Sequence, residues 1–145
     1  MDAGGTEPMP EELERTIGEH LLAEATIISH FVAIAETAGA SQDVINAHLR
    51  DIAERTGLEI WVTDETGLAY LRSTPGIEFR FNPDPDVQPQ ASAFWPVLTG
   101  QRSSLVQEAR KREIDDRLFK YAAVGGIDKP RIVQVGLGLR SAPST

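Results

Sequence analysis

The stretch from Leu58 to Thr74, LEIWVTDETGLAYLRST, constrains the fold more than any other part of the sequence. Apolar residues at positions 58, 60 and 62 alternate with Glu59, Trp61 and Thr63, which predicts a strand with one buried face. The sequence DETG then turns the chain, and its glycine can take the positive φ that such turns often need. Residues 68–73 run back as a second strand rich in β-formers. We therefore predict a hairpin in the middle of the chain.

Composition excludes several classes of function. The chain has 145 residues, of which 41% are hydrophobic and 25% charged, as in one ordinary globular domain. Its net charge of −8 argues against a nucleic-acid partner, which needs a clustered positive surface. Disulfides, thiolate metal sites and a cysteine nucleophile are excluded, because the chain has no cysteine. We see no apolar run of about 18 residues and no secretory signal, so we expect no membrane span in this chain.

A long helix is predicted over residues 11–37. Apolar residues recur at spacings of three or four from Leu13 to Ala35 and form a continuous stripe. Such a helix is roughly 40 Å long, more than a small domain needs to cover its own sheet. We therefore expect its N-terminal half to be an exposed arm that pairs with the same helix of a second copy, giving a homodimer. The alternative is a helix that packs along its whole length on the body of the domain.

Shorter elements follow the long helix. A second helix is expected over residues 41–56, capped by Ser41 and ended by Gly57. After the hairpin, the prolines in residues 75–90 predict a long loop of the kind that often binds ligands. A short aromatic helical turn is expected at residues 91–100.

The C-terminal part reads as three sequential antiparallel strands, at residues 103–110, 117–124 and 131–139. The last strand is the most apolar and is predicted to be central, and its glycines at 136 and 138 suggest close approach of another element, which we expect to be the long helix. The fold class is therefore α+β, with one five-stranded antiparallel sheet over residues 58–139 and two helices before it. We expect one domain at 11–140, between a flexible N-terminus (1–10) and a tail (141–145).

The order of elements and three segments of the sequence resemble the single Cache domains, which are PAS-like sensors. The segments are WVTDETGLAYLRST, AFWPVLTG and FKYAAVGGIDKPRIVQVGL, and the resemblance covers about residues 11–139. It implies a sensor domain of bacterial signal transduction, such as a chemoreceptor, that binds a small organic anion and signals through its long helix as a homodimer. A domain excised from a receptor would lie on the extracytoplasmic side of the membrane, and a standalone relative would lie in the cytoplasm. The amino-acid-binding motif of the double-domain relatives is not visible, so an amino-acid ligand is not implied.

A ligand pocket is expected between the outer face of the sheet, the proline-rich loop and the short helix. Tyr70 and Arg72 share one face of the second strand, and the fork of an arginine suits a carboxylate. Strand parity lets only one of Lys120 and Tyr121 face this pocket, and the sequence leaves open which one. The predicted ligand-binding residues are Tyr70, Arg72, Phe79, Phe94, Trp95, Lys120 and Tyr121.

Motifs for catalysis and for metal or cofactor binding are not visible. No phosphate loop, nucleophile elbow or HExxH zinc motif occurs, and His20, His30 and His48 lie at spacings that do not pair. We therefore expect no enzyme, no catalytic residue, no metal and no cofactor. One alternative is a dimerisation or protein-interaction module with a pocket filled by Phe79, Phe81 and Trp95. Another is a small enzyme using Glu108, Arg110 or Lys120.

Overall fold

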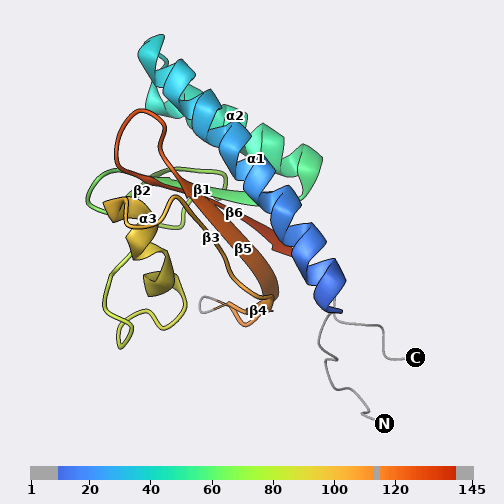
Figure 1. Ribbon diagram of the computed structural model, residues 1–145. Coiled ribbons are helices and arrows are strands. Elements are labelled where there is room, and N and C mark those ends of the chain that lie inside the picture. The colour runs from blue at the N-terminus through green and yellow to red at the C-terminus, as the bar shows by residue number, and fades with distance from the viewer. Residues whose placement is uncertain (1–9, 113–114, 140–145) are drawn as a thin grey trace.

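The computed structural model of the chain describes residues 10–112 and 115–139 (Figure 1). The elements are α1 (Glu11–Thr37), α2 (Gln42–Thr56), β1 (Leu58–Thr63), β2 (Ala69–Arg72), η1 (Ala91–Phe94), α3 (Trp95–Thr99), β3 (Ser104–Val106), β4 (Arg110–Lys111), β5 (Leu118–Gly125) and β6 (Ile132–Gly138). The predicted flexible N-terminus, apart from Pro10, and the predicted tail at 141–145 lie outside the described residues.

The strands form one antiparallel sheet with the order β2-β1-β6-β5-β3, and β4 also pairs with β5. Because β3 and β4 share one edge, the sheet has five positions across. The predicted α+β class, the five-stranded antiparallel sheet and the central place of the last strand are confirmed. The strand predicted at 103–110 is instead two short strands, because the Ala109 N–H leaves the ladder and donates to the Glu14 carboxylate at 3.3 Å.

Local signals explain where the first elements end. Ser41 caps α2 by accepting a hydrogen bond from the Val44 N–H at 3.2 Å. Gly57 ends the same helix with a φ of 78°, which leads directly into β1. Gly67 turns the chain between β1 and β2 with a φ of 91°, as the hairpin motif predicts.

Both long helices cover the same face of the sheet (Figure 1), with α1 on β5 and β6 and α2 on β1 and β2. The N-terminal half of α1 is not an exposed arm, and that prediction is wrong. Gly18 is buried close to the Val106 side chain, and Glu14 pairs with Lys120 of β5. The absence of a side chain at Gly18 lets this half of the helix lie directly on the sheet. α1 therefore packs along its length on its own domain.

Among the described residues, α1 is the one helix long and apolar enough to cross a membrane, with a mean hydropathy of 1.3 over its most apolar window. The expectation that the chain contains no apolar segment long enough to span a membrane is therefore wrong, by length and composition. The core helix of a soluble protein passes the same test, and α1 buries Leu21, Ala25, Ile28 and Val32 against the sheet. This is the packing of a core helix.

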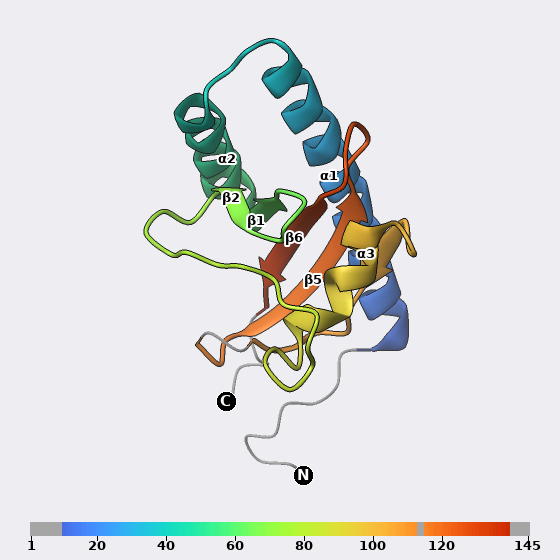
Figure 2. The same cartoon turned by 90° about the vertical axis from the view of Figure 1, so that its left-hand side faces the viewer.

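Strand alternation gives the sheet two different faces. On the helix side, Leu58, Ile60 and Val62 of β1 join a core with Val133 and Val135 of β6. Figure 2 shows the opposite face, which is covered by α3 and by the long connection between β2 and η1. That face carries an aromatic cluster made of Trp61, Phe81, Phe94, Phe119 and Tyr121, together with small and aliphatic side chains. We call the two sides the helix face and the loop face.

The connection between β2 and η1 is fixed to the sheet edge by its backbone. The Phe81 N–H donates to the Gly67 carbonyl at 2.8 Å, and the Ala69 N–H donates to the Phe79 carbonyl at 2.9 Å. These bonds hold the segment so that the side chains of Phe79 and Phe81 cover the loop face. Phe79 and Phe81 meet edge to face with ring centroids 5.0 Å apart.

Candidate functional site

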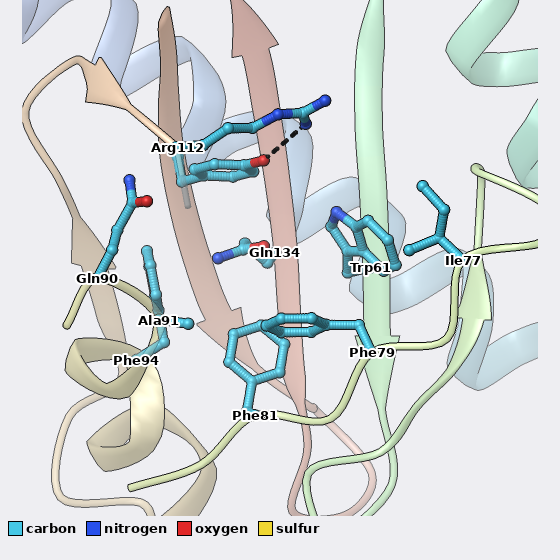
Figure 3. A pocket seen from close by; sticks show the side chains of 10 residues that line it. Trp61, Ile77, Phe79, Phe81, Gln90, Ala91, Phe94, Arg112 and Gln134 are labelled. Atoms are coloured by element: carbon cyan, nitrogen blue, oxygen red, sulfur yellow. Dashed lines mark hydrogen bonds between the residues drawn. The ribbon is translucent and has the colours of Figure 1, made fainter. Parts of the chain in front are cut away.

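A cavity of about 50 Å³ lies on the loop face (Figure 3). Its walls come from the sheet, the β2–η1 connection, η1 and the end of β4. The lining residues are Trp61, Ile77, Phe79, Phe81, Gln90, Ala91, Phe94, Arg112, Tyr121 and Gln134. Most of these side chains are apolar, and Arg112 supplies the positive charge. Figure 3 shows Gln134 of β6 on the floor of the cavity, beside Trp61 of β1.

The floor depends on a row of three residues across neighbouring strands. Glu59 of β1 pairs with Gly136 of β6, which in turn pairs with Tyr121 of β5. A Cβ at Gly136 would lie 2.4 Å from the Tyr121 ring. The missing side chain therefore lets the ring lie across β6, so that its hydroxyl reaches the Glu59 carboxylate at 3.0 Å. The expectation that the long helix approaches this glycine is wrong, because a side chain of the loop face fills the space.

The next row repeats this arrangement. Gly138 pairs with Phe119, and a Cβ at Gly138 would lie 3.4 Å from the Phe119 ring. The rings of Phe119 and Tyr121 are stacked, with centroids 5.5 Å apart. The Arg112 guanidinium lies 3.9 Å above the centre of the Phe119 ring, a favourable cation–π position. The two glycines thus support the platform on which Arg112 rests.

Arg112 is buried and holds two carboxylates. Its Nη1 donates to both oxygens of Glu59 at 2.7 and 2.8 Å and to the Tyr121 hydroxyl at 3.1 Å. Its Nε and Nη2 donate to the two oxygens of Asp115, each at 2.7 Å, in the bidentate geometry that arginine favours. The Trp61 indole N–H adds a further bond to Glu59 at 2.9 Å. Three side chains are thus bonded directly to one guanidinium, and Trp61 joins the group through Glu59.

These contacts shift the protonation of the groups involved. The hydrogen bonds from Arg112 lower the pKa of Asp115 from 3.8 to about 2. Burial raises the pKa of the Tyr121 hydroxyl, and the nearby Glu59 carboxylate raises it further. Tyr121 therefore stays protonated and acts as a hydrogen-bond donor at neutral pH.

Tyr70 and Arg72, the predicted polar pair of the pocket, do not line the cavity. A β-bulge makes Tyr70 an extra residue in β2, because Val62 pairs with Leu71 while Thr63 pairs with Ala69. The Tyr70 side chain packs against the helix face, and its hydroxyl donates to Glu36 of α1 at 2.6 Å. The bulge therefore turns Tyr70 away from the pocket.

Arg72 keeps the loop-face parity, opposite Trp61, but its Nη1 donates to the Ala69 carbonyl at 3.3 Å at the sheet edge. Trp95 also lies outside the lining, with its ring close to Gly67 of the hairpin turn. Neither side chain is placed to touch a ligand in this cavity.

The open choice between Lys120 and Tyr121 is resolved by the sheet. Tyr121 lines the cavity, whereas Lys120 points to the helix face, where its Nζ binds Glu14 and the Gln107 carbonyl. Phe79 and Phe94 line the cavity together with Tyr121. Three of the seven predicted residues are thus brought together.

The sequence analysis missed Glu59, Trp61, Arg112 and Gln134. Strand alternation in the hairpin does carry a signal for Glu59 and Trp61, because both oppose the apolar residues of β1. Arg112 lies in a charged run, which is typical of a solvent-facing turn. Nothing in that run indicates that β4 places its guanidinium over Phe119.

In the part of the chain that the structure describes, no three His, Asp or Glu side chains come close enough to hold a metal ion. Among the described residues, the two acids beside the cavity, Glu59 and Asp115, are both paired with Arg112. The geometry of this site is that of a binding pocket.

No family model matches this chain, and no curated protein matches it either. Among solved structures, it is similar to one described as the structural basis for carboxylic acid recognition by a Cache chemosensory domain. The TM-score is 0.62 at 14% sequence identity, over 91% of this chain and 99% of that chain. The chain therefore has a Cache-like fold, with the helix and sheet arrangement that the resemblance implies.

Proposed function

We propose that this chain is a ligand-sensing domain of bacterial signal transduction that binds a small carboxylic acid in the loop-face cavity. The observation that carries the proposal is the placement of Arg112 and Tyr121 at the polar side of a pocket lined mainly by aromatic side chains. A guanidinium and a neutral hydroxyl are the donors that suit a carboxylate. The similar Cache domain, which recognises carboxylic acids, supports the same ligand class.

The apolar wall would select the remainder of the ligand. Trp61, Phe79 and Phe94 contribute aromatic surface, and a cavity of about 50 Å³ favours an acid of two or three carbon atoms. We assign the recognition of the carboxylate to Arg112 and Tyr121. The other predicted residues, Tyr70, Arg72, Trp95 and Lys120, have no ligand contact in this proposal.

The signal would pass through β5. Tyr121 lines the cavity, and its neighbour Lys120 pairs with Glu14 of α1 on the other face. A ligand that moves Tyr121 would therefore move the attachment of the long helix, since consecutive strand residues point to opposite faces. Ile27 and Ile34, both 66% exposed, would form the α1 surface of a homodimer.

A thermal-shift screen tests the proposal. Acetate, propionate, pyruvate and lactate at millimolar concentration should raise the melting temperature of the folded domain, because a ligand that binds only the native state stabilises it. Arg112→Lys, which keeps the charge but loses the fork, should reduce the shift by more than half. Arg55→Lys on the exposed face of α2 is the matched control and should leave the shift unchanged.

A panel of short acids that gives no shift would refute the ligand class. The small volume of the cavity favours one other function, a dimerisation or protein-interaction module without a ligand. Sedimentation at micromolar concentration distinguishes the two in combination with the screen. A dimer that no acid stabilises supports the interaction module, whereas a monomer would contradict the role we give to Ile27 and Ile34.

A further inference from the structure

The Glu59 carboxylate is held as a bound carboxylic acid would be held. Its donors are Arg112 Nη1 at 2.7 and 2.8 Å, Trp61 Nε1 at 2.9 Å and the Tyr121 hydroxyl at 3.0 Å. These three donor residues all line the cavity, whereas Glu59 is not one of the lining residues. The donors that suit a carboxylate are therefore already used by a side chain of the protein itself.

Charge makes simple addition of a second carboxylate unfavourable. Arg112 carries one positive charge, and its two ion-pair partners, Glu59 and Asp115, carry one negative charge each. These three groups together are thus negative by one charge before any ligand arrives, and the charge of Arg117 also acts on Asp115, as the weakest of the causes that lower its pKa. A further anion placed within hydrogen-bond distance of it would be repelled, and burial strengthens that repulsion. Replacement of one of the two carboxylates by the acid avoids this repulsion.

The geometry favours replacement of Glu59. Asp115 occupies the Nε and Nη2 edge of the guanidinium in a bidentate pair. Trp61 and Tyr121, which also line the cavity, donate to Glu59 and not to Asp115. The Glu59 side chain is 13% exposed, so its carboxylate already lies next to solvent into which it could turn.

We propose that Glu59 is an internal competitor for the ligand, and that an acid binds by taking the place of the Glu59 carboxylate on Trp61, Tyr121 and Arg112. This inference rests on the proposed function and deepens it. The observed free energy of binding is then the difference between the interaction of the ligand carboxylate with these donors and the interaction of the Glu59 carboxylate with the same donors. Glu59 sets the concentration at which the domain responds.

Calorimetric titration with propionate tests this proposal. Glu59→Gln keeps the size of the side chain and an acceptor oxygen but removes the charge, which weakens its hold on Arg112. We expect the variant to bind propionate at least about 10-fold more tightly than the wild type, since hydrogen bonds to charged groups are the stronger ones. Glu54→Gln, an exposed α2 position, removes the same charge from the surface and should bind like the wild type.

Propionamide is the matched uncharged probe. It should not gain from Glu59→Gln as propionate does, because it carries no charge to compete. If propionate binds the wild type and the variant equally, or binds the variant more weakly, the competitor role is refuted while the sensing function stands. If no acid binds either protein, the proposed function fails, and the inference fails with it.

Fluorescence gives a second readout, and it uses a protein in which Glu59 is kept. The chain has two tryptophans, Trp61 and Trp95, and Trp95→Phe outside the cavity leaves Trp61 as the single reporter. Replacement of Glu59 by propionate should change the emission of Trp61, because its indole N–H exchanges one partner for another. Binding detected by calorimetry with unchanged Trp61 emission would show that Glu59 stays in place, even where Glu59→Gln does not fold.

Discussion

The two faces of the sheet are built from the same strands and differ in what they leave empty. On the helix face, aliphatic side chains such as Ile60, Val62 and Val135 pack against α1 and α2 without exposure to solvent. On the loop face, aromatic rings surround a cavity and a buried arginine. Dense aliphatic packing explains why the helix face, in the residues that the structure describes, has no such cavity. The loop face keeps a cavity beside polar side chains that are paired with one another.

Stability and ligand binding therefore depend on different faces of the sheet. Regular helices can match a pleated surface closely, whereas an irregular connection such as residues 75–90 can leave a gap. The ion pairs follow the same division. Lys120 and Glu14 join α1 to the sheet on one face, and Arg112 and Glu59 lie beside the cavity on the other.

The greatest loss of stability is expected from a substitution on the helix face. Leu49→Ala should lower the free energy of unfolding by about 2–5 kcal/mol, because a fully buried leucine leaves a cavity that the helix and sheet cannot close. Denaturation in urea measures the change. Val44→Ala in the same helix is the control at a half-exposed position, with an expected change within about 0.5 kcal/mol. Equal losses for the two variants would contradict the dense packing of this face.

A smaller effect is expected on the loop face from Gly136→Ala. The new methyl group would lie 2.4 Å from the Tyr121 ring and force it off β6, at a cost of about 1–3 kcal/mol for overpacking. The variant should also lose any acid-induced thermal shift, because the Tyr121 hydroxyl leaves its place. Gly125→Ala is the control, since its Cβ would meet only a carbonyl at 3.6 Å. A retained shift in Gly136→Ala would separate Tyr121 from the site.

The smallest effect is on acid stability, for which one carboxylate with a lowered pKa can be compared on each face. Burial alone would raise the pKa of Glu36 on the helix face, but hydrogen bonds from Tyr70 and Arg131 outweigh it and lower the pKa below 4.5. On the loop face, hydrogen bonds from Arg112 lower the pKa of Asp115 from 3.8 to about 2. Each group therefore stabilises the fold above its unfolded pKa and loses that contribution as the pH falls through its folded pKa.

Stability should thus decline between about pH 4.5 and pH 2, and urea denaturation across this range measures the decline. Asp115→Asn should reduce the loss of unfolding free energy below about pH 4 by less than about 1 kcal/mol. The effect is small because the Asp115 side chain is 37% exposed and water screens its pairing with Arg112. An unchanged profile would mean that Asp115 contributes no stability through Arg112.

Much of the fold was accessible from the sequence because its signals are local. Helical spacing predicts α1 with the bounds Glu11–Thr37 that the structure shows, and alternation predicts β1. The antiparallel arrangement follows from short connections between strands. The errors came from non-local packing. The N-terminal half of α1 reads as an arm because the contact of Gly18 with Val106 is not visible in the pattern of either segment.

The site was less accessible than the fold. A single bulged residue at Tyr70 reverses the face that alternation assigns to it. Arg112 reaches Glu59, which is 53 positions away in the sequence, through the pairing of β4 with β5. The sequence analysis did place Phe79 and Phe94 at one pocket, because it predicted that the loop and short helix cover the sheet, but it left Lys120 and Tyr121 as alternatives. The charged partners depend on register, which no local motif specifies.

The alternating glycines of β6 have a consequence for reading other sequences. Gly136 and Gly138 face the rings of Tyr121 and Phe119 across one strand pair, so each absent side chain on one strand matches a large one on its neighbour. Two segments written G-x-G and aromatic-x-aromatic, expected to pair antiparallel, would therefore indicate rings lying flat across a sheet. Such a pattern locates the floor of a pocket from spacing alone. In this chain it reads FKY and GLG.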